Sequence, residues 1–243
     1  MKIALIGYGK MGHAVERFAV ERGHEIVCRI DETNADDFDS VAFARADVAI
    51  EFSVPGAAAL NYERAFAKGV PVVSGTTGWM DQMPRVRHIL AETGATLLWS
   101  SNFSIGVNLF MRVSEYLARL MEKFPQYAPA MKEIHHIHKL DHPSGTAITI
   151  AEGIIANNPR VEGWTEDETS DTPGRMVISH ERVGEVPGTH IVSWTSPVDA
   201  ITIEHRAFSR DGFALGAVMA AEWVVANPDR KGLLSVNDML SDL

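Results

Sequence analysis

Residues 1–31 contain the feature that most restricts what this chain can fold into. An apolar run over residues 2–6 is followed at once by Gly7, Gly9 and Gly12, in the pattern Gly-x-Gly-x-x-Gly. Apolar residues then recur at helical spacing, a second apolar run reaches residue 30, and Asp31 follows it, 19 residues after Gly12. This order predicts a strand, a tight turn, a helix and a second strand, as in a dinucleotide-binding βαβ unit.

Each glycine has its own role in such a unit. The first permits the tight turn, the second lets the backbone approach a pyrophosphate, and the third allows close packing of helix and strand. The helix start offers N–H groups to the phosphates, and Asp31 can accept hydrogen bonds from ribose hydroxyls. The alternative is a turn that only packs a helix on a strand. We expect the cofactor to contact Asp31 and the six residues of the turn: Gly7, Tyr8, Gly9, Lys10, Met11 and Gly12.

Three further apolar segments, 47–52, 70–74 and 95–99, alternate with helical patterns. This alternation predicts a parallel, doubly wound sheet, in which ligands bind beyond the carboxyl ends of the strands. Small and hydroxyl-bearing residues follow all three segments, although glycines there also suit ordinary turns. We expect further cofactor contacts from Ser53, Gly75, Thr76, Thr77, Ser100, Ser101, Asn102 and Phe103.

The second half of the chain has a different pattern, with strands outnumbering helices. Helical patterns cover 107–123 and 146–156, strand patterns cover 131–136, 175–180, 189–194 and 200–205, and 161–171 reads as an acidic loop. A last helical pattern at 212–226 is expected to cover the first sheet. The predicted fold is therefore α/β. It combines a Rossmann-type parallel sheet, residues 1–104 with 212–243, and an α+β domain with a mainly antiparallel sheet, residues 105–211.

Residues 133–146 are the densest in chemistry, because four of the ten histidines fall within residues 135–142. Histidine titrates near neutrality and can donate a proton, and Lys139 can neutralise a carboxylate or act as an acid. Ser144, Gly145 and Thr146 open a predicted helix, whose N–H and hydroxyl groups suit an anion. The segment predicts a cationic, proton-donating pocket for a small acid.

A metal site is the alternative for this segment, with His138 and His142 as an i, i+4 pair beside Asp141. Pro143 argues against one continuous helix through that pair, so we expect no metal. The histidines can also be packing or surface residues, above all His142. The single Cys28 excludes an intramolecular disulfide and any cysteine-based metal centre.

Composition excludes several classes of partner. With 22 basic and 32 acidic residues, the net charge of −10 argues against nucleic acid and against an anionic membrane surface. Hydrophobic residues at 46% and charged residues at 22% are typical of a globular protein. No signal peptide or membrane-spanning segment is evident, and we expect a cytoplasmic protein.

Residues 135–147, His-His-Ile-His-Lys-Leu-Asp-His-Pro-Ser-Gly-Thr-Ala, resemble the signature of the 4-hydroxy-tetrahydrodipicolinate (dihydrodipicolinate) reductase family. The likeness extends to residues 75–78, 102–108, 184–190 and 209–217. It implies reduction of a cyclic unsaturated dicarboxylate with NADH or NADPH in the diaminopimelate route to lysine. It also implies a homotetramer built through the second-domain sheets. By resemblance, His135 is the catalytic acid/base, Lys139 a second proton donor or carboxylate ligand, and the substrate carboxylates are held by His136, Ser144, Gly145 and Thr146.

The sequence departs from the family pattern at Ile137, where an arginine is frequent, and in a glycine loop one residue shorter. Asp31 should repel a 2′-phosphate and favour NADH, whereas Arg29 and Lys10 could offset this and leave NADPH usable. Two other functions stay open at this point. One is another two-domain dehydrogenase, and the other is a non-catalytic dinucleotide sensor, which needs the glycine turn but no clustered proton donors.

Overall fold

The computed structural model describes residues 1–170 and 172–241 and divides the chain into two compact units. The first unit comprises Met1–Ile105 and the chain from Asp211 onward, and the second comprises Gly106–Arg210. Asp171, at the end of the expected acidic loop, and residues 242–243 of the expected first domain lie outside the described residues. Within the described part, no helix is both long and apolar enough to cross a membrane.

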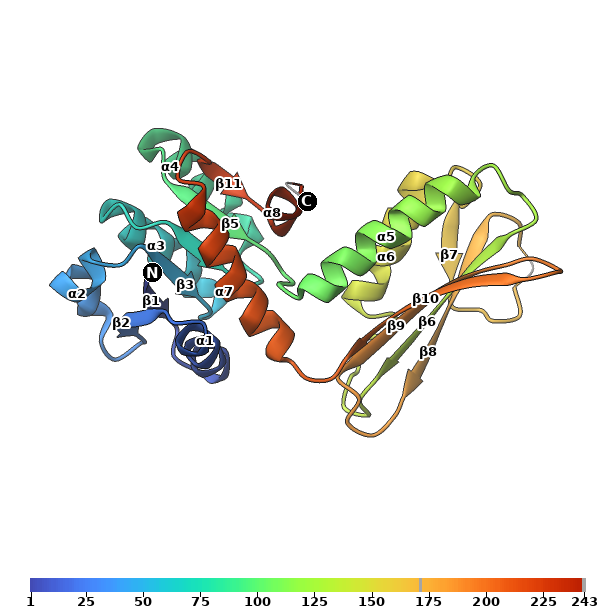
Figure 1. The fold of residues 1–243 in the computed structure, drawn as a ribbon, viewed down its shortest axis with the longest axis horizontal. Coiled ribbons are helices and arrows are strands. Elements are labelled where there is room, and N and C mark those ends of the chain that lie inside the picture. Colours follow the sequence, from blue (N-terminus) through green and yellow to red (C-terminus); the bar gives the residue numbers. More distant parts are fainter. Residues whose placement is uncertain (171, 242–243) are drawn as a thin grey trace. The chain divides into compact units, whose positions relative to one another are not determined.

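The first unit is built on a six-stranded sheet in the order β11-β5-β4-β3-β1-β2 (Figure 1). Every neighbouring pair is parallel, so the carboxyl ends of the strands lie at one edge, as the Rossmann-type prediction requires. Strand β11 was not predicted. The strands are β1 (Lys2–Ile6), β2 (Glu25–Ile30), β3 (Val48–Glu51), β4 (Val72–Ser74), β5 (Thr96–Trp99) and β11 (Gly232–Leu234).

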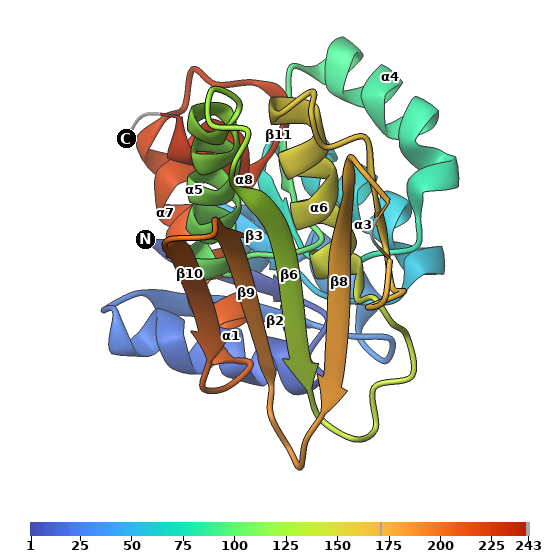
Figure 2. The ribbon, with the colours of Figure 1, turned by 90° about the vertical axis from the view of Figure 1, so that its right-hand side faces the viewer.

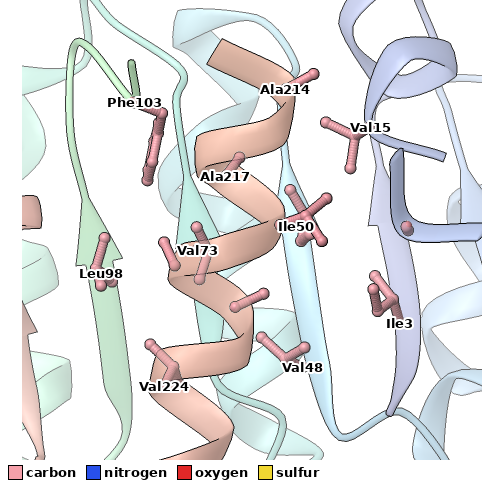
Figure 3. Close-up of a cluster of buried hydrophobic side chains, with 14 of the residues drawn as sticks. Ile3, Val15, Val48, Ile50, Val73, Leu98, Phe103, Ala214, Ala217 and Val224 are labelled. Carbon is pink, nitrogen blue, oxygen red and sulfur yellow. The ribbon is translucent and has the colours of Figure 1, made fainter. Parts of the chain in front are cut away.

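Helices cover both faces of this sheet and enclose two apolar cores. One core is covered by α1 (Lys10–Glu21), α7 (Asp211–Ala226) and α8 (Val236–Leu240). The other is covered by the short helices η1 (Ala35–Asp39) and α2 (Val41–Ala44), by α3 (Pro55–Ala67), and by α4 (Met83–Thr93), which follows η2 (Met80–Gln82). Figure 3 shows α7 lying along the strands, with Ala214 and Ala217 beside Ile50. Small side chains on α7 let its backbone approach the sheet.

Helix α7 lies very close to the loop after β5 at Gly216. A Cβ atom at Gly216 would lie 1.8 Å from the carbonyl oxygen of Phe103, a backbone atom that cannot swing away. The Phe103 side chain is itself buried in the same core. The position of α7 therefore depends on the absence of a side chain at residue 216.

The second unit has a five-stranded sheet in the order β10-β9-β6-β8-β7. The expected antiparallel pairing joins β9 to β10 and to β6, while β8 runs parallel to β6 and to β7, so the sheet is mixed. Strand β7 lies within the segment predicted as an acidic loop. The strands are β6 (Ala128–His135), β7 (Gly163–Thr165), β8 (Arg175–Arg182), β9 (Gly188–Thr195) and β10 (Ala200–Ala207).

Two helices, α5 (Ile105–Met121) and α6 (Gly145–Asn157), pack on one face of this sheet (Figure 2). Ser144 starts α6, because its hydroxyl accepts a hydrogen bond from the backbone N–H of Ala147 at 3.1 Å. Alternate residues of the central strand β6 face the helices: Met131, Glu133 and His135 are all buried. The carboxyl end of β6 and the start of α6 thus frame the segment that carries the histidines.

We predict that Gly216→Ala destabilises the first unit by about 1–3 kcal/mol, because the added methyl group overlaps a backbone carbonyl. The matched control is Gly56→Ala in α3, where an added Cβ meets nothing within 4 Å and should leave stability equal or slightly higher. Thermal unfolding of both variants measures the difference. Equal melting temperatures would show that α7 shifts freely away from the loop.

Candidate active site

The glycine turn after β1 has the shape that a dinucleotide requires. Gly7 has φ +87°, and a Cβ there would lie 2.0 Å from the carbonyl oxygen of Phe52. A Cβ on Gly12 would lie 2.4 Å from the carbonyl oxygen of Gly7, whereas one on Gly9 would meet nothing within 4 Å. Packing therefore accounts for the first and third glycines. The open space at Gly9, before the N-terminus of α1, fits an approaching pyrophosphate.

Asp31 lies just past the carboxyl end of β2, at the same edge of the sheet, and is exposed. Its Oδ1 accepts hydrogen bonds from the backbone N–H of Thr33 at 2.7 Å and from the Thr33 hydroxyl at 2.6 Å. These hydrogen bonds hold the pKa of Asp31 below its ordinary value. An ionised carboxylate here can accept hydrogen bonds from ribose hydroxyls.

Arg29 and Lys10, the two cations that could offset the repulsion between Asp31 and a 2′-phosphate, differ in their surroundings. Arg29 Nε donates to Glu16 Oε2 at 2.9 Å, and the Tyr8 hydroxyl donates to the same oxygen at 2.5 Å. The bond from Arg29 lowers the pKa of Glu16 to about 2 against the effect of burial. The charge of Arg29 is therefore compensated by Glu16, whereas Lys10 is exposed in the first turn of α1.

A buried carboxylate organises the loops after β3 and β4. Glu51, the last residue of β3, is fully buried and accepts hydrogen bonds from the hydroxyl groups of Ser74, at 2.6 Å, and Ser53. The backbone N–H of Ser53 donates to Thr76 Oγ1 at 2.8 Å, which joins the two loops. Sequence reasoning missed Glu51, although an acidic residue ending an apolar strand beside predicted binding residues was a usable signal.

Two tryptophans fix the loop after β4. The indole Nε1 atoms of Trp79 and Trp99 both donate to the carbonyl oxygen of Thr76, at 2.9 and 2.8 Å. A Cβ on Gly75 would overlap the ring of Phe52, while Thr77 is exposed. The loop therefore has little freedom on its core side and presents its exposed residues at the edge of the sheet.

The loop after β5 is held by local hydrogen bonds. The Ser100 hydroxyl donates to the carbonyl of Asn102 at 2.8 Å, and Asn102 Oδ1 accepts from the backbone N–H of Ser104 at 2.9 Å. Ser101 is exposed, but Phe103 is 1% exposed and belongs to the core. Phe103 therefore has only its backbone to offer a cofactor, and Met11 likewise packs its side chain against that core.

A cavity of about 450 Å³ lies at the opposite edge of the first sheet. Its lining includes Asp47, Thr96 and Lys231, which precede or begin β3, β5 and β11. Ligands of doubly wound sheets bind at the carboxyl ends of the strands, so this cavity is separate from the predicted cofactor site.

In the second unit, a buried charge cluster lies where β6 ends and α6 begins. His135 is 7% exposed, and its Nδ1 lies 3.4 Å from Oε2 of the fully buried Glu133. The backbone N–H of Ser144 donates to both Glu133 oxygens at 3.1 Å, and Arg182 Nη2 donates to Oε1 at 3.3 Å. Glu133 was not among the predicted site residues.

Burial governs the protonation of the two histidines in this cluster. It lowers the pKa of His135, an effect that the charge of Glu133 opposes. It also lowers the pKa of His190 to about 4, and the His190 ring packs edge-on to that of His135 with centroids 5.2 Å apart. His190 is therefore neutral at physiological pH and acts as a packing partner.

The other predicted substrate residues lie around this cluster. Lys139 Nζ contacts both carboxylate oxygens of Asp141 at 2.8 Å. His136 is half-buried, and its Nδ1 is buried without a hydrogen-bond partner among the described residues. Gly145 and Thr146 form the first turn of α6, where N–H groups lack intrahelical acceptors. These groups together favour a bound anion.

The metal alternative considered from the sequence is not assembled. His138 lies 3.1 Å from Glu185, His142 lies 2.8 Å from Glu166, and Asp141 pairs with Lys139, so each member has a different partner. The structure brings together two other sets with ligand atoms within 4.8 Å: buried Glu133, His135 and His190, and exposed His142, Glu166 and His180.

Neither set has the geometry of a prepared metal site. A metal ion lies near the plane of each imidazole that binds it, yet His142 and His180 are stacked at 4.3 Å with an interplanar angle of 18°. Both rings would have to turn before sharing one ion. In the buried set, the oxygens of Glu133 already accept hydrogen bonds from Ser144 and Arg182.

The fold and the site define a class of protein. A Rossmann-type sheet with its glycine turn and acidic residue, followed by a unit with clustered histidine and lysine, is typical of a two-domain NAD(P)-dependent oxidoreductase. Residues 1–103 match the sequence family described as "Dihydrodipicolinate reductase, N-terminus", and residues 106–240 match "Dihydrodipicolinate reductase, C-terminus". The chain belongs to the dihydrodipicolinate reductase family.

Individual relatives agree with this assignment. The 4-hydroxy-tetrahydrodipicolinate reductase of Christiangramia forsetii is 44% identical over 243 residues, covering 100% of this chain and 99% of the relative. The 4-hydroxy-tetrahydrodipicolinate reductase of Archaeoglobus fulgidus is 36% identical, and the match covers 99% of this chain and 100% of the relative. A solved dihydrodipicolinate reductase from Paenisporosarcina sp. TG-14, bound to dipicolinate, has the same fold, with a TM-score of 0.78, 21% identity and 97% coverage of each chain.

Proposed function

We propose that this chain reduces 4-hydroxy-tetrahydrodipicolinate to tetrahydrodipicolinate with NADH or NADPH, in lysine biosynthesis through diaminopimelate. The observation that carries this proposal is the segment from 133 to 146. There the structure gathers a buried histidine, a lysine and the N-terminus of a helix at one end of the second sheet. Proton donors and anion-binding groups in one place suit reduction of a small dicarboxylate.

The residues of the second unit divide this work between them. The substrate loses its hydroxyl group as water, which leaves a conjugated imine, and the bound cofactor would supply a hydride to an electron-poor carbon of that imine. His135 donates a proton to the adjacent carbon, and Lys139 binds a carboxylate in place of Asp141 or serves as a second proton donor. His136, Ser144, Gly145 and Thr146 bind the substrate carboxylates through the imidazole and the start of α6. The cations also stabilise charge that develops during reduction.

The first unit holds the cofactor along the carboxyl edge of its sheet. The backbone of residues 7–12 approaches the pyrophosphate, Asp31 binds the adenosine ribose, and the loops containing Ser53, residues 75–77 and residues 100–103 line the nicotinamide side. NADH is the preferred cofactor, because Asp31 is ionised and Arg29 is already paired with Glu16. NADPH stays usable, since Lys10 is free to approach a 2′-phosphate.

The proposal includes an assembly and a location. We place homotetramer contacts on the second sheet, whose helices α5 and α6 share one core on one side. The proposed reaction needs no metal ion, because loss of water followed by hydride and proton transfer completes the reduction. The cytoplasm is the proposed compartment, since it supplies reduced nicotinamide cofactors.

The function is tested by following the absorbance of reduced nicotinamide with freshly generated 4-hydroxy-tetrahydrodipicolinate, using NADH and NADPH in parallel. We expect substrate-dependent loss of the signal with both cofactors. Cofactor binding without turnover would instead indicate a dinucleotide sensor. Turnover only with another amino-acid or sugar substrate would indicate a different two-domain dehydrogenase.

We predict that His135→Gln lowers kcat by about 10²–10⁴-fold, the scale of general acid catalysis, because glutamine lacks a transferable proton. His138→Gln is the matched control, since that side chain is 68% exposed and forms its ion pair with the exposed Glu185. Steady-state kinetics of both variants decide the matter. An unchanged kcat in His135→Gln would remove His135 from the proton-donating role.

We predict that Asp31→Ala lowers kcat/KM for NADH by about tenfold or more, the cost of losing hydrogen bonds to a charged acceptor. The value for NADPH should fall less or rise, because the repulsion of the 2′-phosphate is removed as well. Glu32→Ala removes the same charge from the exposed neighbour and serves as the control. A constant NADH-to-NADPH ratio in Asp31→Ala would contradict the assigned contact.

A further inference from the structure

Glu133 is an acidic residue on the buried face of strand β6. It follows Met131 and precedes His135 on the helix-covered face of β6, and it is 0% exposed. A carboxylate is expensive to bury unless it is hydrogen-bonded or paired with charge. A buried carboxylate at this position therefore needs hydrogen-bond or charge partners, and the identity of these partners indicates the role of Glu133.

The hydrogen-bond partners of Glu133 among the described residues belong to the proposed substrate site or its support, and His190 Nε2 lies 3.9 Å from Oε2. Ser144, the N-cap of α6, donates its backbone N–H to both carboxylate oxygens at 3.1 Å, and Arg182 donates to Oε1 at 3.3 Å. Arg182 also donates to the carbonyls of Lys139, at 3.2 Å, and Asp141, at 2.7 Å. Glu133 is thus joined to the loop of Lys139, to the start of α6 and to His135.

Glu133 is ionised in this setting. Burial favours the neutral acid, but hydrogen bonds from Ser144 and Arg182 and the charge of His135 outweigh it, and the pKa of Glu133 lies below its ordinary value. An ionised carboxylate 3.4 Å from Nδ1 of His135 attracts a proton on that nitrogen. The protonated Nδ1 fixes which tautomer the neutral ring adopts.

We propose that Glu133 is a positioning residue, whose carboxylate holds the Nδ1–H of His135 and thereby presents Nε2 as the proton-donating atom. The inference rests on the proposed role of His135 as the acid. In this role Glu133 acts on the reaction through His135 and does not itself touch the substrate.

The surroundings of Nε2 agree with this assignment. A Cβ atom at residue 188 would lie 3.1 Å from Nε2 of His135, and residue 188 is glycine. The chain thus leaves the Nε2 side of the ring free of a side chain from β9. The opposite nitrogen, Nδ1, is buried without a hydrogen-bond partner among the described residues, and Oε2 of Glu133 lies 3.4 Å from it.

The groups facing His135 give Glu133 a second effect. Burial lowers the pKa of His135, and the neighbouring Lys139, Arg182 and His136 lower it further. Glu133 acts in the opposite direction and raises it, while the adjacent His190 stays neutral. Without the carboxylate, a smaller fraction of His135 would carry the proton it must donate.

The proton balance is simple. In imidazolium His135, the N–H bond at Nε2 breaks, its electron pair stays on the nitrogen, and a C–H bond forms on the substrate carbon next to the one that accepted hydride. The ring is left neutral with its proton on Nδ1, against Glu133. Water then returns a proton to Nε2.

The first test uses the unaltered protein with its cofactor bound. Nitrogen-15 NMR of the imidazoles above the His135 pKa should show neutral His135 with its proton on Nδ1. A proton on Nε2 would overturn the proposal, and the result does not depend on whether any variant folds.

The second test is Glu133→Gln, with Glu133→Asp as the conservative variant. Glutamine removes the charge, so we expect the pKa of His135 to fall and the alkaline loss of kcat to move to lower pH. At neutral pH kcat should drop by about tenfold or more, with smaller changes in KM for NADH. Glu133→Asp should restore part of both effects. Glu181→Gln, an exposed carboxylate on β8 paired with Lys132, is the control and should shift neither.

The outcomes separate this inference from the proposed function. If His135→Gln is inactive while Glu133→Gln folds and keeps the wild-type pH profile and His135 pKa, Glu133 serves the structure alone. If His135→Gln is fully active, the acid itself is misassigned. A loss of thermal stability in Glu133→Gln with an unmoved pH profile also overturns the positioning role.

Discussion

The parallel alignment of six strands is the constraint on which the first unit depends. Parallel pairing brings all carboxyl ends to one edge, so the glycine turn, Asp31 and three loops from separate parts of the chain become neighbours. Hydrogen bonds on the core side then hold the loops in place. Glu51 accepts from the hydroxyls of Ser53 and Ser74, and two indole N–H groups donate to the carbonyl of Thr76. A rigid edge of this kind suits a cofactor whose nicotinamide must be held in one orientation.

The second unit differs from the first, because it contains a charged group inside its core. Glu133 is buried as an ion only because a helix cap, a guanidinium group and an imidazole surround it. The same contacts tie the first residues of α6 to the end of β6. If Glu133 positions His135 as proposed, stability and reactivity both depend on this one carboxylate, and the loss of one of its partners would disturb the others.

Patterns with strong local signals were predictable from the sequence. The glycine spacing and Asp31 predicted the first βαβ unit, and the alternation of apolar segments with helical patterns predicted the parallel sheet. Short elements without such signals were missed: β11 has only three residues, and β7 lies in an acidic stretch. Glu133 was missed because its burial depends on which face of the strand its side chain occupies. Only the shared face of residues 131, 133 and 135 shows that the acid points into the core. The partners of His138 and His142, which depend on distant segments, carried no sequence signal.

The first sheet is interrupted in sequence, and this affects how the protein emerges from the ribosome. Helix α7 and strand β11 complete the first unit, yet both are synthesised after the entire second unit. Until then the outer edge of β5 has no strand partner, and the face that α7 covers is exposed apolar surface. The second unit is one continuous stretch that can collapse as soon as it is made. The part of the protein that is translated first is therefore the last to reach its native form.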